Sequence, residues 1–299
     1  MTDTGFIGTG TIGAPMALRM LEAGHRLRVH DVLREVTREL EARGAVHAPT
    51  VREIAQTCDV VCLSLPGPPQ IEEVLLGAGG LLAYARPAAV IVDLSTNSLA
   101  LNRRIAAAAA ARGVHYLDAP VSGGRAGAAA GRLSVMVGGD RAAFEAVRGR
   151  LECFAKHVFY LGASGFGTLA KLVNNQIFLA ASVLVQEGFV FGTKAGIEPD
   201  ALLEVLKASS AGPLLAHAPL MLSREFSRDV FALAIAAKDV AVALESATAL
   251  GVDAPVTTAA HAVYRRALDA GFGAEDFYAT VKVLERAAGV AVPALKGGR

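Results

Sequence analysis

Short apolar runs alternate with longer amphipathic stretches over the first half of the chain. The apolar runs are rich in β-branched residues, which favour strands, and the stretches between them have helical spacing. Predicted strands cover residues 4–8, 27–31, 59–65, 89–94 and 114–117, and predicted helices include 14–23, 35–43 and 99–112. Because strands that alternate with helices form βαβ units, this pattern predicts a parallel sheet with helices packed on it.

The pattern changes near residue 167, where long apolar helical segments begin and β-rich runs become rare. These segments cover residues 168–195, 199–208, 232–250, 255–270 and 274–287. The turn-rich residues 162–167 separate them from the last predicted strand, around 158–161. We therefore expect an α/β domain over residues 1–163 and an all-helical domain over 164–299, joined by a long helix at about 168–195.

The composition is that of an ordered globular protein without a strong charge. Of 299 residues, 53% are hydrophobic, and 29 Lys and Arg nearly balance 28 Asp and Glu. No global field attracts nucleic acid or an anionic membrane, so we expect a small-molecule partner. The longest candidate for a membrane span, residues 177–185, ends at Gln186 and Glu187, well short of the roughly 20 apolar residues that a bilayer requires. This predicts a buried helix of a soluble protein.

The cysteines and histidines show no pattern of disulfides or metal ligands. Cys58, Cys62 and Cys153 have neither CxxC nor Cys/His metal spacing, and the seven histidines are not paired. We interpret the cysteines as small core residues of a reduced, cytoplasmic protein that needs no metal. The N-terminus passes directly into a strand and shows no export signal.

The first predicted strand ends in a glycine-rich turn that leads into a helix. Gly8, Gly10 and Gly13 form a GxGxxG pattern, and Thr11 and Ile12 complete the turn. In such a turn the first glycine permits a tight bend, the second lets the backbone approach a pyrophosphate, and the third allows close helix–strand packing. The turn therefore predicts a Rossmann-like domain that binds a dinucleotide.

An acidic residue at the end of the second predicted strand points to the kind of dinucleotide. Asp31 lies about 20 residues beyond the turn, where a carboxylate hydrogen-bonds the adenosine ribose hydroxyls. A carboxylate there favours NAD because it repels a 2′-phosphate, but Arg34 is near enough to keep NADP open. The alternative interpretation is a ligand-free turn, with Asp31 capping a strand end.

Residues 118–139, DAPVSGGRAGAAAGRLSVMVGG, form a second glycine-rich segment. Ser122, Gly123 and Gly124 could present a hydroxyl and successive backbone N–H groups to a carboxylate. By composition alone, an ordinary glycine-rich loop fits equally well.

Four motifs in order make the chain resemble the β-hydroxyacid dehydrogenase family, which includes 3-hydroxyisobutyrate dehydrogenase and tartronate semialdehyde reductase. They are GFIGTGTIGAPMALRMLEAGH, the segment DAPVSGGRAGAAAGRLSVMVGG, GFGTLAKLVNN, and AAKDVAVALESATALGVDAP. The resemblance spans nearly the whole chain. It implies a Rossmann-like N-terminal domain joined by a long helix to an all-α domain, with the active site in the cleft between them.

The resemblance also implies roles for individual residues. Lys171 matches the catalytic lysine, Asn175 with Asn174 beside it matches the amide that holds substrate, and Ser122, Gly123 and Gly124 match the carboxylate-binding positions. The implied cofactor positions beyond the first turn are Leu65, Pro66, Thr96 and Lys238. Asp239, next to Lys238, could instead be a simple charge on a helix surface.

The implied chemistry requires one group that handles a proton. Lys171 qualifies if burial and nearby charge bring its pKa from about 10.4 toward neutrality. On a helix, Lys171 and Asn175 share one face. The alternative is a lysine whose chain passes its apolar neighbours to reach water. We expect an NAD(P)-dependent oxidoreductase that interconverts a small β-hydroxy acid and its semialdehyde, of the 3-hydroxyisobutyrate or tartronate semialdehyde/glycerate type.

Other functions remain open at this point. The alternatives on the same fold are an imine or succinic semialdehyde reductase, and a further one is a non-catalytic dinucleotide-binding module. Lys171 argues against an imine reductase, whose proton donor is typically an acid or a tyrosine, and against a module without catalysis. Residues 207–215 lack the Asn-Ser and Trp pattern associated with 3-hydroxyisobutyrate dehydrogenase, which leaves the substrate open. The resemblance, more than the apolar helix over 177–191, implies at least a dimer, a homodimer or a homotetramer.

Overall fold

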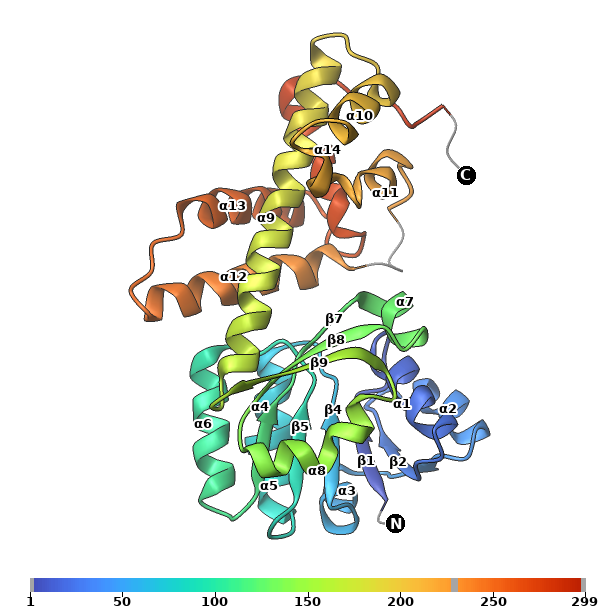
Figure 1. The fold of residues 1–299 in the computed structure, drawn as a ribbon, viewed down its shortest axis with the longest axis vertical. Helices are drawn as coiled ribbons and strands as arrows, with labels where there is room; N and C mark the ends of the chain where they lie inside the picture. The colour runs from blue at the N-terminus through green and yellow to red at the C-terminus, as the bar shows by residue number, and fades with distance from the viewer. Residues whose placement is uncertain (1–2, 227–230, 297–299) are drawn as a thin grey trace. The chain divides into compact units, whose positions relative to one another are not determined.

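The computed structural model describes residues 3–226 and 231–296 (Figure 1). The chain divides into two compact units, Met1–Leu172 and Val173–Arg299. The long helix α9, Phe166–Lys194, begins in the first unit and continues into the second.

The first unit is built on a nine-stranded sheet with the order β3-β2-β1-β4-β5-β6-β8-β7, and β9 pairs with β8. The strands are β1 Thr4–Ile7, β2 Leu27–His30, β3 Val46–His47, β4 Val60–Leu63, β5 Val90–Asp93, β6 His115–Asp118, β7 Val121–Ser122, β8 Leu133–Gly138 and β9 Ala155–Gly162. Strands β1 to β6 are parallel, which confirms the predicted parallel sheet. Strand β8 runs antiparallel to β6 and β7, a feature that the sequence pattern did not predict.

Helices cover both faces of this sheet, because side chains alternate between two separate cores along its central strands. Phe6 and Cys62 pack into one core, whereas Ile7 and Val61, the residues next to them in sequence, pack into the other. The helices of this unit are α1 Gly13–Glu22, α2 Arg38–Ala42 after the 3₁₀ helix η1 Arg34–Thr37, α3 Val51–Thr57, α4 Pro68–Leu76, α5 Leu81–Tyr84, α6 Leu99–Ala110, α7 Gly124–Ala129 and α8 Arg141–Leu151.

The cysteines follow this core arrangement in part. Cys58 and Cys62 are buried, as the sequence predicted, whereas Cys153 is half-buried. Burial raises the pKa of the Cys62 thiol to about 12, so that side chain stays protonated and unreactive.

The described part of the second unit contains helices and no strand, apart from one isolated bridge between Ala232 and Asp276. After α9 come α10 Pro199–Lys207, η2 Gly212–Leu215, α11 Ala218–Leu222, α12 Leu233–Ala249, α13 Pro255–Asp269, η3 Phe277–Thr280 and α14 Val281–Ala288. Leu179, Phe189 and Tyr264 lie at the centre of its core, where the Tyr264 hydroxyl donates to the Leu179 carbonyl at 3.2 Å. This confirms the predicted all-helical second half.

Helix α9 has one buried face and one exposed face. Leu179 and Val183 are buried in the helical core, but Ile177 is 63% exposed and Leu184 is 60% exposed. The prediction of a buried helix over 177–185 is therefore wrong for this second face. By length and composition α9 could cross a membrane, and 28% of its most apolar stretch is buried within the protein.

Candidate active site

The glycine turn after β1 has a backbone that only glycine fits at two positions. Gly8 has a φ of +88°, and a Cβ atom there would lie 2.2 Å from the Ser64 carbonyl oxygen. A Cβ on Gly13, at the start of α1, would lie 1.9 Å from the Gly8 carbonyl oxygen. A Cβ on Gly10, in contrast, would meet no atom within 4 Å. The backbone at Gly10 thus faces open space at the start of α1, which fits a pyrophosphate.

The other predicted cofactor residues of the first unit follow the carboxyl ends of neighbouring parallel strands. Asp31 follows β2, Leu65 and Pro66 follow β4, and Thr96 follows β5, while Thr11 and Ile12 lie in the glycine turn. Strand order reverses between β1 and β4, and dinucleotides bind in the crevice at such a reversal. The Leu65 N–H donates to the Ser95 hydroxyl at 2.9 Å, which ties two of these loops together.

A buried carboxyl, Asp93, holds the loop after β5 through a hydrogen bond to Ser95. Asp93, the last residue of β5, accepts hydrogen bonds from the Ser95 N–H at 3.0 Å and the Tyr116 hydroxyl at 2.9 Å. Burial raises the pKa of Asp93 to about 6, against the lowering effect of these donors. Ser95, which accepts from Leu65, is therefore held at both its backbone and its hydroxyl.

The Asp31 carboxylate is fixed by the backbone on both sides. It accepts from the Thr9 N–H at 2.7 Å and from the Leu33 N–H at 3.0 Å. Because Thr9 belongs to the glycine turn, the carboxylate is held next to the predicted pyrophosphate position.

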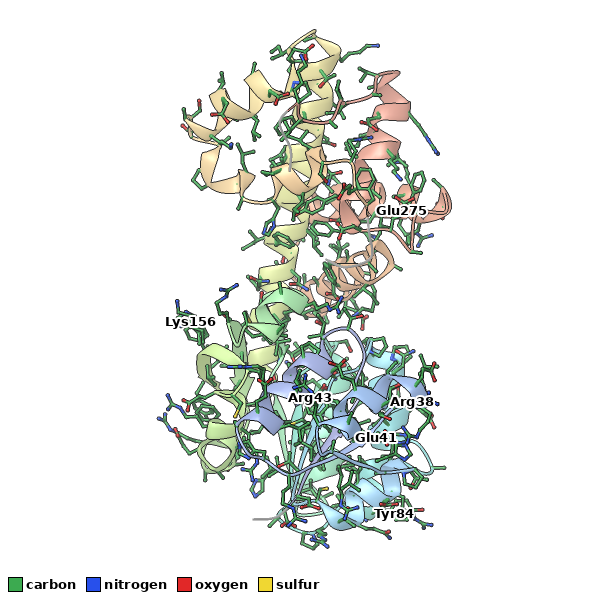
Figure 2. All side chains as sticks on the ribbon, turned by 90° about the vertical axis from the view of Figure 1, so that its right-hand side faces the viewer. Arg38, Glu41, Arg43, Tyr84, Lys156 and Glu275 are labelled. Atoms are coloured by element: carbon green, nitrogen blue, oxygen red, sulfur yellow. The ribbon has the colours of Figure 1, made fainter. Side chains whose placement is uncertain are left out.

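Arg34, the cation that left NADP open, is engaged with another side chain. Its guanidinium forms a two-pronged ion pair with Glu41 of α2, with 2.7 Å between Nη2 and Oε2. Glu41 is labelled in Figure 2. The Thr37 hydroxyl lies 2.6 Å from Glu41 Oε1. The hydrogen bonds from Arg34 and Thr37 lower the pKa of the Glu41 carboxyl. The charge of Arg34 is therefore directed at a carboxylate of the same chain.

The predicted carboxylate-binding loop begins in the antiparallel part of the sheet. Ser122 ends β7 and pairs with Ser134 of β8. Gly123 and Gly124 have φ values of +128° and +63°, and both residues are exposed at the start of α7. The loop presents a half-buried hydroxyl followed by exposed backbone.

A buried carboxylate at the end of β6 caps α9. Asp118 is 1% exposed and accepts from the Gly165 N–H at 2.8 Å and from the Thr168 N–H at 2.7 Å. These N–H groups belong to the first turn of a helix, where no carbonyl within the helix is available to accept them. Burial raises the pKa of Asp118, and the two N–H donors lower it. Asp118 thus sets the start of the helix whose next turn carries Lys171.

Sequence reasoning assigned no role to Asp118, although it opens the glycine-rich segment 118–139. A further residue without a predicted role, Asn102 of α6, donates to the Thr168 hydroxyl at 3.1 Å. The only available signal was a carboxylate directly after an apolar strand, which many loops share.

In the second unit, Asn175 is held by a buried polar chain. It is 3% exposed and donates to Asp239 Oδ2 at 2.7 Å, and its own Oδ1 accepts from Asn174 at 3.0 Å. Lys238 Nζ lies 2.6 Å from Asp239 Oδ1. Asp239 is 1% exposed, so its interpretation as a surface charge is wrong. The orientation of the Asn175 amide is fixed from both ends.

The predicted site residues fall into two groups. Lys171 belongs to the first unit together with Ser122, Gly123, Gly124 and the glycine turn. Asn174, Asn175 and Lys238 belong to the second unit. Lys171 is half-buried and lies four residues before Asn175 on α9, so both lie on one face of one helix. The role of Lys238 at the cofactor stays a prediction.

These features define a class of protein, the NAD(P)-dependent dehydrogenases with a Rossmann-like domain followed by a helical domain. Residues 3–162 match the NAD binding domain of 6-phosphogluconate dehydrogenase, and residues 165–284 match the NAD-binding domain of NADP-dependent 3-hydroxyisobutyrate dehydrogenase. The chain belongs to the β-hydroxyacid dehydrogenase family and is an NAD(P)-dependent 3-hydroxyacid dehydrogenase.

Individual relatives match over nearly the whole chain. The chain is 37% identical to an NAD-dependent L-serine dehydrogenase of Pseudomonas aeruginosa, over 95% of this chain and 98% of the relative. It is also 37% identical to a 2-hydroxy-3-oxopropionate reductase of Escherichia coli, over 94% and 96% of the two chains. Among solved structures, 3-hydroxyisobutyrate dehydrogenase of Mycobacterium tuberculosis, a complex with L-serine, has a TM-score of 0.86 at 31% identity, covering 95% and 99%.

The cap on α9 can be tested by removing one of its two acceptors. In Asp118→Asn, an amide N–H replaces one carboxylate oxygen and faces a backbone N–H donor. We expect the free energy of unfolding to fall by about 1–3 kcal/mol, measured by denaturant titration. The control is Asp140→Asn, because Asp140 caps α8 through a single bond from Ala143 and asparagine caps as well as aspartate. Equal stability of Asp118→Asn and Asp140→Asn would contradict the role of Asp118.

Proposed function

We propose that the protein interconverts a small 3-hydroxy acid and its semialdehyde, of the 3-hydroxyisobutyrate or glycerate type, with Lys171 as the acid/base. The observation that carries the proposal is the fixed placement of Lys171. Asp118 caps α9 one turn before Lys171, and Asn175, one turn after it, is held by Asp239. The relatives named for L-serine and 2-hydroxy-3-oxopropionate, both three-carbon compounds, support this substrate class.

Each group of the chain then has one task. The bound nicotinamide supplies the acceptor or donor of hydride. The Ser122 hydroxyl and the backbone N–H groups of Gly123 and Gly124 bind the substrate carboxylate. Lys171 Nζ takes the hydroxyl proton during oxidation and returns it to the carbonyl oxygen during reduction. Asn175 orients the substrate. Its amide can do so because Asp239 and Asn174 hold the amide nitrogen and oxygen in one orientation.

The role of Lys171 is tested by Lys171→Ala. We expect kcat to fall by roughly 10²- to 10⁴-fold, because one acid/base group is lost. The Kd for NADH should stay within about twofold, because the glycine turn and Asp31 are untouched. Turnover is followed by NADH absorbance with 3-hydroxyisobutyrate, glycerate, L-serine, 3-hydroxypropionate and 4-hydroxybutyrate. Binding is followed by NADH fluorescence, which no tryptophan obscures because the chain has none.

Lys194→Ala serves as the matched control, because Lys194 lies at the far end of α9 and is exposed. It should keep wild-type turnover. An equal loss of turnover and NADH affinity in Lys171→Ala would make the lysine structural. Wild-type inactivity on the whole substrate panel would overturn the proposed substrate class.

We propose that NAD is preferred over NADP. Asp31 is fixed beside the glycine turn, where its charge repels a 2′-phosphate, and Arg34 is paired with Glu41 rather than directed toward such a phosphate. The choice of cofactor then depends on Glu41 as well as on Asp31.

This dependence is tested by Glu41→Gln, which removes the charge that holds Arg34. We expect the ratio of kcat/KM for NADP to that for NAD to rise by on the order of tenfold, because a freed guanidinium can bind a phosphate. Kd values for NADH and NADPH, measured by fluorescence, should shift in the same sense. Glu39→Gln removes the same charge elsewhere on α2 and should leave the ratio unchanged. A wild type that prefers NADP would refute the assignment of Asp31.

We further propose a cytoplasmic homodimer, formed through the exposed face of α9. Ile177, Leu184 and Phe191 recur every seven residues and are 63%, 60% and 77% exposed. A seven-residue apolar repeat suits the packing of one helix against another, and the same stripe on a second copy makes a self-complementary interface.

The dimer is tested by Phe191→Glu, which places a charge in this stripe. We expect a monomer by light scattering where the wild type is a dimer, because an unpaired buried charge costs several kcal/mol. Val256→Glu on α13, where valine is 73% exposed, should leave the dimer intact. A wild-type monomer, or a dimer in both variants, would rule out this interface.

A further inference from the structure

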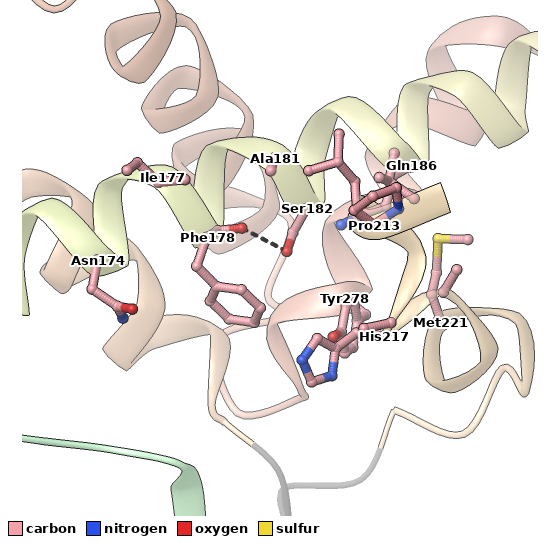
Figure 3. Close-up of a pocket in the computed structure, with 14 residues that line it drawn as sticks. Asn174, Ile177, Phe178, Ala181, Ser182, Gln186, Pro213, His217, Met221 and Tyr278 are labelled. Carbon is pink, nitrogen blue, oxygen red and sulfur yellow. Dashed lines mark hydrogen bonds between the residues drawn. The ribbon is translucent and has the colours of Figure 1, made fainter. Parts of the chain in front are cut away.

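A cavity of about 350 Å³ lies within the second unit, along one face of α9 (Figure 3). Its α9 lining starts at Asn174 and continues through Phe178 and Ala181 to Gln186. Twelve residues separate Asn174 from Gln186 on this helix, a rise of roughly 18 Å. The cavity therefore leads away from the amide pair proposed to hold substrate.

Two buried side chains that line the cavity each have a polar atom without a hydrogen-bond partner among the described residues. Gln186 is 1% exposed, and its Oε1 accepts from the Thr280 hydroxyl at 2.7 Å, but its Nε2 has no partner within residues 3–226 and 231–296. Tyr278 is 4% exposed, and its hydroxyl has no partner either. Burial, with nearby Asp276, raises the pKa of Tyr278, so this hydroxyl stays protonated and can donate. Such groups are costly to bury alone, which points to a ligand that bonds them.

The other lining residues determine which parts of the ligand are apolar and whether it can carry a charge. The middle of the cavity is apolar, with Phe178, Ala181, Val185 and Met221 on its walls. Ser182 also lines it, but its hydroxyl is already bonded to the Phe178 carbonyl at 2.9 Å. Among the residues that the structure describes, the lining contains His217 but no lysine, arginine or carboxylate. A charged end group would lose its hydration there without gaining a full counter-charge.

We propose that this cavity binds the chain of a larger 3-hydroxy acid, in which a C2 substituent has an apolar stem and an uncharged polar end, such as an amide. The hydroxyl group of this acid reacts, Asn174 and Asn175 hold the acid near the start of the cavity, and the polar end bonds Gln186 and Tyr278. This inference rests on the proposed function and narrows its substrate class. A volume of about 350 Å³ holds on the order of ten non-hydrogen atoms, since a water occupies about 30 Å³ of liquid.

Binding to the cavity is tested without any turnover. The probes are hexanamide and hexanoate, which share a stem and differ in end charge, with the full-length protein and saturation-transfer NMR. We expect hexanamide to bind with a Kd on the order of 1 mM and hexanoate to bind at least about tenfold more weakly. Gln186→Leu should weaken hexanamide by roughly three- to tenfold, because one hydrogen bond is lost. Ala181→Phe, which fills the middle of the cavity, should abolish binding.

The variants have matched controls. Gln176→Leu removes the same amide from α9 outside the cavity and should bind hexanamide as the wild type does. Gln186→Leu is expected to fold, because the Thr280 hydroxyl keeps the Phe277 carbonyl as an acceptor at 2.9 Å. Thermal unfolding of each variant checks this directly.

Kinetics then connect the cavity to substrate. A 3-hydroxypropanoate with a 4-carbamoylbutyl group at C2 should have a kcat/KM at least about tenfold above its 4-carboxybutyl analogue. Ala181→Phe should lower kcat/KM for the amide substrate at least about tenfold more than for 3-hydroxyisobutyrate. Equal losses for both substrates would overturn the inference.

Failure of the inference differs from failure of the proposed function. If hexanamide does not bind, for example because a second copy fills the cavity, the inference is wrong even where 3-hydroxyisobutyrate is oxidised. If hexanamide binds but no 3-hydroxy acid is oxidised, the proposed function fails, and the role of the cavity as part of a substrate site fails with it.

Discussion

The placement of the start of α9, which carries Lys171, depends on one buried carboxylate. Asp118 ends β6 and accepts the first N–H groups of α9, at Gly165 and Thr168. Backbone approach reinforces this contact, since a Cβ on Gly167 would lie 2.2 Å from the Met136 carbonyl oxygen of β8. The start of α9 therefore has little room to shift against the sheet, and the position of Lys171 follows from that of Asp118.

Hydrogen bonds of buried or half-buried carboxylates give the candidate site its rigidity. Asn175 is fixed through Asp239, Asp31 through the N–H groups of Thr9 and Leu33, and Ser95 through Asp93. Asp239 and Asp93 each orient a neighbouring group, whereas the Asp31 carboxylate is itself oriented by backbone N–H groups. The energetic cost of leaving a buried carboxylate unpaired keeps these arrangements in place. The residues proposed to act on ligand are in this way supported by residues that do not.

Sequence patterns predicted those parts of the fold that repeat locally. The parallel strands, the glycine turn and the helical second half all follow from periodicity and from motifs of a few residues. The pairing of β8 with β6 and β7 was missed because its run, Leu133–Gly138, carries no sign of direction. The sequence over 177–191 left open which residues of α9 are exposed, because apolar residues give the same pattern whether they face a core or a partner.

Some site residues could be predicted from local spacing, and others depend on contacts that form only in the folded chain. The spacing of Gly8, Gly13 and Asp31 predicts their roles, whereas the pairing of Arg34 with Glu41 depends on how η1 continues directly into α2. Asp239 was taken for a possible surface charge because its partner, Asn175, is 64 residues away. The predicted domain boundaries and the roles of the individual site residues stay predictions.

The distance in sequence between Asp118 and its partners has a consequence for how the chain reaches this state. The two bonds that cap α9 close segments of 47 and 50 residues, in which β7, β8, α8 and β9 must first take their places. Closing segments of this length costs more chain entropy than forming the glycine turn, which is local. The glycine turn can therefore form early from nearby residues, while the position of Lys171 is set late, when the sheet has assembled.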